Sequence, residues 1–285
     1  MRSESGFPAD REGDAPALKI NLPLLKKWQV RNATTTAPPS TLKNIMQRKL
    51  DEHVAAYQDS NIYYFDNKIL LTWYPQRILA HSNGATSLLE LGLGHGYTSS
   101  IFSTSFSRHQ VLEGSAAVIQ NFRENFPDCR AEIIETYFET FSTDEKFDLI
   151  VMGFILEHVD DPLEIISRYK QFLAPDGKMF VAVPNAEALN RRLGHLAGML
   201  PDMEALSEND FLLGHKRYYS ARSLTRDVEQ AGCRVDKLEG IYLKPFTSSQ
   251  MISLNLPDSI VQALCEVGID YPELSCGILA QISTS

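Results

Sequence analysis

The sequence predicts an α/β fold in which a mostly parallel sheet carries helices on both faces. From Ser87 onward, short apolar runs alternate with amphipathic stretches, which is the pattern of a sheet built from strand–helix–strand units. A glycine-rich turn follows the first of these runs, as is typical of a strand that leads into a helix at a ligand site. With 285 residues, of which 44% are hydrophobic, the chain can form one large domain of this class with additions.

The chain divides into three predicted parts. Residues 1–40 form an N-terminal segment whose order the sequence leaves open, and residues 41–84 are predicted to be a helical cap. Residues 85–285 form the main domain, in which residues 185–215 interrupt the alternation and are predicted to be an inserted lid. Apolar residues at helical spacing predict a core-facing stripe within the cap, namely Ile69, Leu70, Trp73, Tyr74 and Ile78.

The alternation assigns each element of the main domain in order. Strands are expected at about 87–91, 109–113, 131–134, 147–152, 177–183, 233–242 and 275–283. Helices are expected at about 97–106, 115–125, 160–173, 220–231 and 258–268. A tight turn from Leu173 to Gly177 is expected to lead into the fifth strand.

The glycine-rich turn, Glu90-Leu91-Gly92-Leu93-Gly94-His95-Gly96, is the most informative motif. Glycine allows positive φ and lets a ligand approach the backbone closely. The spacing G-x-G-x-G differs from the dinucleotide pattern G-x-G-x-x-G, and Glu90 would repel a pyrophosphate. A carboxylate there suits a ligand with a cationic end, such as S-adenosylmethionine. A dinucleotide site and a purely structural glycine turn remain alternatives.

Residues at the ends of the next strands extend this candidate site. Glu113 lies about 20 residues after the first glycine, where an acid can accept hydrogen bonds from both hydroxyls of a ribose. Tyr137 and Phe138 follow the third strand and could wall an adenine ring, although a core aromatic pair is the alternative. The fourth strand leads into Gly153 and Phe154, at the edge where open α/β sheets bind ligands.

Composition excludes several function classes. A formal net charge of −9 argues against a nucleic-acid partner, because such binding depends on clustered Lys and Arg. The four cysteines form no C-x-x-C pair, so we expect reduced thiols and a cytoplasmic location. No apolar stretch approaches 18 residues and the N-terminus has no apolar signal region, so no membrane partner is expected.

Several segments in this order and spacing give the chain a family resemblance. They are Glu90–Gly96, Phe147–Ile150, Leu156–Pro162, Leu173–Lys178 and Gly214–Ser220. Together they resemble the class I S-adenosylmethionine-dependent methyltransferases, of the branch that includes the ubiquinone-biosynthesis O-methyltransferases. The resemblance implies a Rossmann-like, seven-stranded, mostly parallel sheet with one antiparallel strand near its edge.

The resemblance also implies roles for the candidate residues. The methionine end of the cofactor would contact Glu90, Gly92 and Gly94, the ribose would contact Glu113, and the methyl group would face Gly153 and Phe154. Adenine would lie near Tyr137 and Phe138. The rest of the predicted cofactor set is Leu93, Gly96, Tyr97, Gly114 and Ser115. Two departures matter, because the acid that is usual at the adenine edge is missing and residues 1–80 and 240–285 match no motif.

Methyl transfer needs alignment and often a base, and histidine titrates near neutral pH. The candidates are His158 and His215, each with an alternative role in bonding a loop or anchoring the lid. Candidate acceptor contacts are Tyr63, Tyr64 and Tyr218. No metal is expected, because the histidines are scattered and the fourth strand ends in a glycine rather than an acid.

The sequence therefore predicts an enzyme that moves a methyl group from S-adenosylmethionine to an oxygen or nitrogen atom of a small molecule, leaving S-adenosylhomocysteine. A protein or RNA methyltransferase, a donor-binding member without turnover and an NAD-type oxidoreductase are the alternatives. The sequence gives neither the acceptor nor the oligomeric state.

Overall fold

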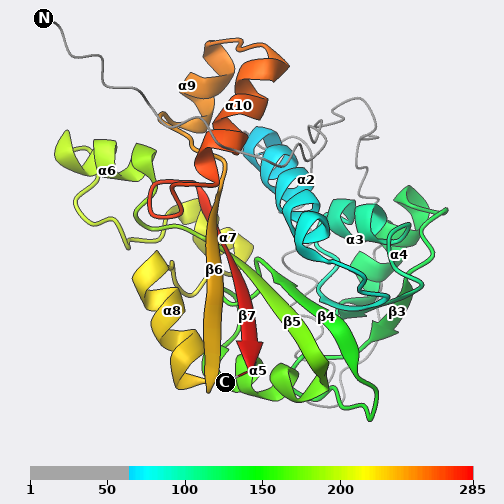
Figure 1. The fold of residues 1–285 in the computed structure, drawn as a ribbon. Coiled ribbons are helices and arrows are strands. Elements are labelled where there is room, and N and C mark those ends of the chain that lie inside the picture. The colour runs from blue at the N-terminus through cyan, green and yellow to red at the C-terminus, as the bar shows by residue number, and fades with distance from the viewer. Residues whose placement is uncertain (1–63, 285) are drawn as a thin grey trace, which may run out of the picture.

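The computed structural model describes residues 64–284, in which seven strands form one sheet in the order β3-β2-β1-β4-β5-β7-β6 (Figure 1). The strands are β1 (Ser87–Leu91), β2 (Arg108–Glu113), β3 (Glu132–Glu135), β4 (Phe147–Gly153), β5 (Leu173–Pro184), β6 (Cys233–Ile241) and β7 (Gly277–Thr284). All neighbouring pairs from β3 to β5 are parallel, and β7 runs antiparallel to both β5 and β6. The predicted seven-stranded, mostly parallel α/β fold is confirmed.

Helices join the strands and lie on both faces of this sheet (Figure 1). They are α2 (Tyr64–His81), α3 (Tyr97–Phe102), α4 (Ala116–Asn125), α5 (Pro162–Tyr169), α6 (Leu189–Leu196), α7 (Glu208–Leu213), α8 (Ala221–Gln230), α9 (Ser248–Ser253), α10 (Asp258–Gly268) and the 3₁₀ turn η3 (Lys170–Phe172). Figure 1 shows α6, α9 and α10 beyond the end of the sheet from which β7 starts, which is the end where the parallel strands finish.

Two hydrophobic cores occupy opposite faces, because successive residues of β5 point to opposite sides of the sheet. Met179 and Val181 pack under α5 and α8, whereas Phe180 and Ala182 pack under α2. The predicted apolar stripe of α2 lies in this second core, with Trp73 1% exposed. Burying each large apolar side chain there contributes roughly 1.5–3 kcal/mol.

An ion cluster around the buried carboxylate of Glu239 joins α2 to the sheet. Arg77 donates two hydrogen bonds to the Glu239 carboxylate of β6, at 2.8 and 3.0 Å. His81 Nε2 and Lys237 Nζ each lie 2.8 Å from Oε1 of the same carboxylate. Burial raises the pKa of Glu239, but Arg77, Lys237 and His81 outweigh it and lower the pKa to about 2. The carboxylate is therefore ionised at neutral pH and anchors α2.

Three details differ from the expected elements. Helix α3 ends at Phe102 rather than 106, because the Ser103 and Thr104 hydroxyls donate to carbonyls in the last turn and compete with the helix. The predicted turn interrupts β5 instead of preceding it, since the register jumps from Phe147↔Leu173 to Leu149↔Lys178. Helix α9 was not expected, because it has only six residues and depends on a capping box.

Within residues 64–284, no helix combines the length and the apolar character that crossing a lipid bilayer requires. The predicted insertion contains α6 and α7. Residues 41–63 of the predicted cap lie outside the described residues, as does the N-terminal segment.

Candidate cofactor and acceptor site

The glycine turn lies between β1 and α3, and its three glycines differ in what surrounds them. All have positive φ, at 80° for Gly92, 47° for Gly94 and 79° for Gly96. A Cβ at Gly92 would lie 2.8 Å from Ile155 Cδ1, and one at Gly96 would lie 2.6 Å from the rings of Phe122 and Phe126. A Cβ at Gly94 would meet no atom of residues 64–284 within 4 Å. Packing thus explains two of the glycines, and Gly94 faces open space that a ligand can use.

Glu113 lies beside this turn, as predicted. Its carboxylate accepts hydrogen bonds from the backbone N–H of Leu93 at 3.1 Å and of Ser115 at 2.8 Å. The Ser115 hydroxyl in turn caps α4 by accepting from Val118 N–H at 3.2 Å, and buried Gly114 lies between the two. The acid therefore holds the turn in shape at the point where a ribose contact was predicted.

The predicted aromatic wall also borders the turn. The Phe138 ring comes within 3.8 Å of the position that a Cβ at Gly92 would take. The Tyr169 hydroxyl donates to the Phe138 carbonyl at 3.1 Å, which fixes the backbone after β3. Tyr137 and Phe138 are both half-buried, so each keeps an exposed part at this edge. Their contact with adenine remains a prediction.

Glu90 has a protein partner in this structure. Its carboxylate is 2% exposed and lies 2.9 Å from Nε2 of the buried His109 on β2. The predicted contact of Glu90 with a cofactor ammonium group therefore competes with His109. Tyr97 is also buried, with its ring against Phe126 and parallel to that of His95.

Helix α2 covers the glycine turn and the end of β4. Asn67 Nδ2 lies 3.4 Å from His95 Nε2, and burial lowers the pKa of His95 to about 4. The Tyr74 hydroxyl lies 3.1 Å from Thr98 Oγ1 and only 2.1 Å from where a Cβ at Gly153 would be. Sequence reasoning treated Tyr74 as core and missed this contact, because nothing local relates α2 to β4.

The predicted residues at the end of β4 have unusual backbone geometry. Phe154 has a φ of 57°, a left-handed conformation that non-glycine residues seldom adopt. Its N–H donates to Ala182 O at 2.8 Å, and its ring packs edge-on against Tyr74 at 5.7 Å. Strained backbone of this kind concentrates at functional sites, which supports this edge as part of one.

The structure brings the two predicted base candidates together and adds a third residue, Glu157. One ligand atom from each of Glu157, His158 and His215 lies within 4.8 Å of the others, and the two imidazole rings are 4.7 Å apart. Neither oxygen of the Glu157 carboxylate, which is 1% exposed, has a hydrogen-bond partner among the described residues. Burial raises its pKa to about 7, although His215 and Arg217 oppose the shift. The cluster can hold or release a proton near neutral pH.

Backbone contacts assemble this cluster from distant segments. Lys216 N–H donates to the Glu157 carbonyl at 2.8 Å, and the Arg217 guanidinium donates to the carbonyls of Leu156 and Val159 at 2.8 and 2.6 Å. The carboxylate of Glu157 and the imidazole nitrogens of His158 and His215 could also ligate a divalent cation. The expectation that no metal is bound therefore remains a prediction.

The insertion contributes a second layer around His215. Asp210 Oδ1 lies 3.2 Å from His215 Nδ1, and Tyr218 donates to Asp210 Oδ2 at 2.9 Å. Burial raises the pKa of Asp210, but His215, Ser207 and Tyr218 outweigh it and hold that pKa well below its usual range. The Arg191 guanidinium stacks on the Tyr218 ring at 4.3 Å. Tyr218 is thus a partner of His215 through Asp210.

The other candidate acceptor contacts lie at the start of the described chain. Tyr64 is the first residue of α2 and is half-buried. Tyr63 lies outside the described residues.

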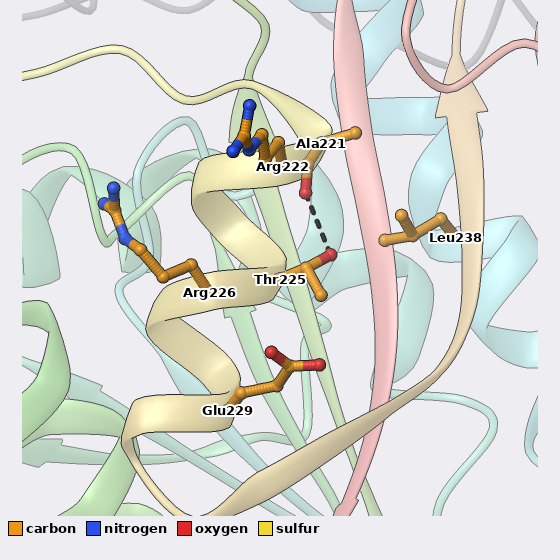
Figure 2. Close-up of a pocket in the computed structure, with 6 residues that line it drawn as sticks. All are labelled: Ala221, Arg222, Thr225, Arg226, Glu229 and Leu238. Atoms are coloured by element: carbon orange, nitrogen blue, oxygen red, sulfur yellow. Dashed lines mark hydrogen bonds between the residues drawn. The ribbon is translucent and has the colours of Figure 1, made fainter.

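A separate open hollow of about 440 Å³ lies between α8 and β6 and is lined by Ala221, Arg222, Thr225, Arg226, Glu229 and Leu238 (Figure 2). None of the predicted site residues lines it, so it is not the candidate site.

Comparison with known proteins agrees with this geometry. Residues 38–238 match the family model described as a methyltransferase domain. The chain is 27% identical over 177 residues to a trans-aconitate 2-methyltransferase of Variovorax paradoxus, covering 59% of this chain and 65% of that protein. It is 28% identical over 219 residues to a ubiquinone biosynthesis O-methyltransferase of Actinobacillus pleuropneumoniae, covering 72% of this chain and 92% of that protein.

Solved structures share the fold at low identity. A magnesium protoporphyrin IX methyltransferase from Synechocystis with bound SAH has a TM-score of 0.56 at 11% identity, covering 85% of this chain and 100% of that chain. The N-methyltransferase NodS from Bradyrhizobium japonicum, in complex with S-adenosyl-L-homocysteine (SAH), has a TM-score of 0.52 at 14% identity, covering 84% and 97%.

The strand order, the open glycine turn and the acid beside it define a class I S-adenosylmethionine-dependent methyltransferase fold. The chain belongs to the methyltransferase-domain family, whose model covers most of its length. The predicted class and cofactor are thereby confirmed, whereas the roles of individual residues are not tested by these comparisons.

Proposed function

We propose that this protein transfers a methyl group from S-adenosylmethionine to an oxygen or nitrogen atom of a small molecule in the cytoplasm. The observation that carries the proposal is Gly94, which lies next to a contact of the Glu113 carboxylate and where an added Cβ would meet no atom of the described residues within 4 Å. A nucleoside can approach the backbone at such a position and place its ribose hydroxyls near an acceptor of hydrogen bonds. The neighbouring aromatic residues, Tyr137 and Phe138, offer an apolar wall for the base.

Each part of the site has a proposed task. Gly92, Gly94 and Gly96 shape the turn, and Glu113 orients the ribose. The sulfonium supplies an already activated methyl group when the cofactor is bound. Gly153 and Phe154 border the region where donor and acceptor meet, at the carboxyl end of β4.

The histidine cluster handles the proton of the acceptor. As the acceptor oxygen or nitrogen forms its bond to the methyl carbon, His158 or His215 takes the proton that this atom loses. The ionised Asp210, which lies 3.2 Å from His215 Nδ1, stabilises an imidazolium at His215, and the buried Glu157 lies close to both rings. Tyr64 and Tyr218 are proposed to contact the acceptor.

Calorimetric titration with S-adenosylmethionine, S-adenosylhomocysteine and NAD tests the donor site. Micromolar binding of either sulfur nucleoside, with no heat from NAD, is expected. Binding of NAD alone would contradict the proposal and favour an oxidoreductase. A metabolite screen with labelled donor would then identify the acceptor, and labelling only of protein or RNA would contradict a small-molecule role. Donor binding with no transfer to any class would indicate a member without turnover.

A further inference from the structure

A second buried polar cluster lies outside the predicted site, where α2 meets the segment after β6. Lys244 Nζ lies 2.7 Å from Asp66 Oδ2 and 3.3 Å from Ser248 Oγ. The Ser248 hydroxyl also donates to Asp66 Oδ2. Asp66, Lys244 and Ser248 are each 6% exposed or less. Helix α2 and the segment from Lys244 to Ser248, which are distant in sequence, therefore bring charged and polar side chains together in the interior.

Two buried polar atoms in this region lack hydrogen-bond partners among the described residues. They are Asp66 Oδ1 and the hydroxyl of Tyr242, a residue with no exposed surface, and neither has a partner within the described part of the chain. Burial, with the neighbouring Asp66 charge, raises the pKa of Tyr242, so the hydroxyl stays protonated. Leaving buried polar atoms unpaired costs stability, and native structures seldom retain them without a reason.

The backbone at Tyr242 is also strained. Its φ is 60°, and hydrogen bonds on both sides hold it there, because Cys276 N–H donates to the Tyr242 carbonyl at 2.8 Å and Leu243 N–H donates to Leu264 O at 3.0 Å. A bulky residue in the left-handed region is rare. The fold thus maintains an unfavourable conformation that aims an unsatisfied hydroxyl into the interior.

The cluster lies at the same edge of the sheet as the end of β4. Tyr242 directly follows β6, and Cys276 directly precedes β7. Asn185, directly after β5, donates its N–H to the Cys276 carbonyl at 3.0 Å. The Phe154 ring reaches within 3.4 Å of the position that a Cβ at Gly277 would take. Residues from β4, β5, β6 and β7 therefore converge where the acceptor is proposed to bind.

We propose that Asp66 and Tyr242 form an anchoring subsite for the acceptor, which takes a hydroxyl or amino group that donates a hydrogen bond. This inference rests on the proposed function. An ionised carboxylate would not suit the subsite, because Asp66 Oδ1 would repel it and Lys244 is already paired with Asp66. An apolar group would leave both polar atoms unsatisfied. The subsite therefore selects acceptors with a hydrogen-bond donor away from the methylated atom.

Tyr242→Phe is the informative variant, because removing an unpaired hydroxyl breaks no hydrogen bond within the described residues. The probes are catechol and veratrole, which have the same aromatic ring but differ in that veratrole has no hydrogen-bond donor. Both are titrated calorimetrically into the full chain saturated with S-adenosylhomocysteine. We expect catechol to bind at least about tenfold more tightly than veratrole, and the variant to lose about five- to tenfold in catechol affinity alone.

Three controls separate a subsite from a packing role. The affinity for S-adenosylhomocysteine should not change, and the melting temperature should stay level or rise, because an unsatisfied group has been removed. Tyr219→Phe, a buried tyrosine on the opposite face of the sheet, should leave catechol affinity unchanged.

Three outcomes would overturn the inference and leave the cluster as a site for ordered water only. They are equal affinities for catechol and veratrole, an unaltered catechol affinity in Tyr242→Phe, and no catechol binding at all. Failure of S-adenosylhomocysteine to bind would instead contradict the proposed function. The comparison of the two probes on the unloaded protein would then still decide whether the subsite exists.

Discussion

The donor side and the acceptor side of the candidate site differ in which parts of the chain form them. The donor side, which comprises residues 92–96, Glu113 and residues 137–138, is formed mainly by backbone conformation and short-range hydrogen bonds. The acceptor side, which comprises the Glu157–His158–His215 cluster and the Asp66–Tyr242 subsite, is formed by side chains from elements far apart in the chain. A shared donor can be bound by a local motif, whereas selection of an acceptor needs residues that only the tertiary fold assembles.

The largest effect on cofactor binding should come from closing the donor side at Gly94. Gly94→Val places a branched side chain at a φ of 47° in the space proposed for the cofactor, so binding of S-adenosylhomocysteine should weaken by about 100-fold or more. Calorimetry measures this. Gly84→Val is the matched control, because Gly84 also has positive φ and open surroundings but lies outside the site. Equal losses in both variants would show that the effect is a general loss of folding.

A substitution at Glu239 tests whether ion pairs hold α2, the helix that covers the glycine turn and the end of β4, against the sheet. Glu239→Gln leaves Arg77, His81 and Lys237 without their carboxylate, so the unfolding free energy at pH 7 should fall by about 3 kcal/mol. The folded pKa is about 2 against an ordinary 4.5, so this stability is present above pH 4.5 and is lost as the pH falls toward 2. Urea unfolding at several pH values measures it. A wild-type stability that does not fall in this acid range would contradict the prediction.

Glu157 should show the opposite pH dependence. Its folded pKa of about 7 exceeds the ordinary 4.5, so the folded state retains a proton that the unfolded chain releases between these values. Its contribution is therefore complete below pH 4.5, and about 3 kcal/mol is lost as the pH rises through 7. Glu157→Gln should remove this loss and be the more stable protein at pH 8. Glu164→Gln, at an exposed position on α5, is the control and should keep the wild-type profile.

The smallest expected loss of cofactor affinity is that of Glu113→Ala, which tests whether Glu113 binds the ribose or only shapes the turn. Glu113→Ala should weaken S-adenosylhomocysteine binding by about 1–3 kcal/mol, or about 5- to 150-fold in Kd, as expected when a charged acceptor of hydrogen bonds is lost. Glu132→Ala, an acid at the far end of neighbouring β3, should bind normally. Unchanged affinity in Glu113→Ala would mean that the acid serves only Leu93 and Ser115.

The sequence allowed most of the fold to be predicted and the donor side to be proposed, because both depend on local patterns. The alternation from Ser87 onward fixed seven strands whose expected bounds differ from those of the structure by a few residues, and the glycine spacing placed the turn. Helix α9 was missed because a six-residue helix with a polar cap carries little periodicity.

The acceptor side could be predicted only in part. His158 and His215 were identified as candidates, but Glu157 was not, because its isolation from hydrogen-bond partners is a property of the packed interior. Nothing near Asp66 in the sequence indicates that Tyr242 and Lys244 will lie beside it. These contacts depend on how α2 packs against the segment that follows β6. Local patterns in a single sequence do not reveal that packing.

The order of strands in the sheet also has a consequence for biosynthesis. Among the described strands, β6 pairs only with β7, although β7 is the later of the two in the chain. On the ribosome, β6 must therefore wait as an unpaired segment until residues 277–284 have emerged and inserted between it and β5. The proposed donor side, made from strands that emerge early, can be complete while the half of the sheet that is proposed to recognise the acceptor is still unformed.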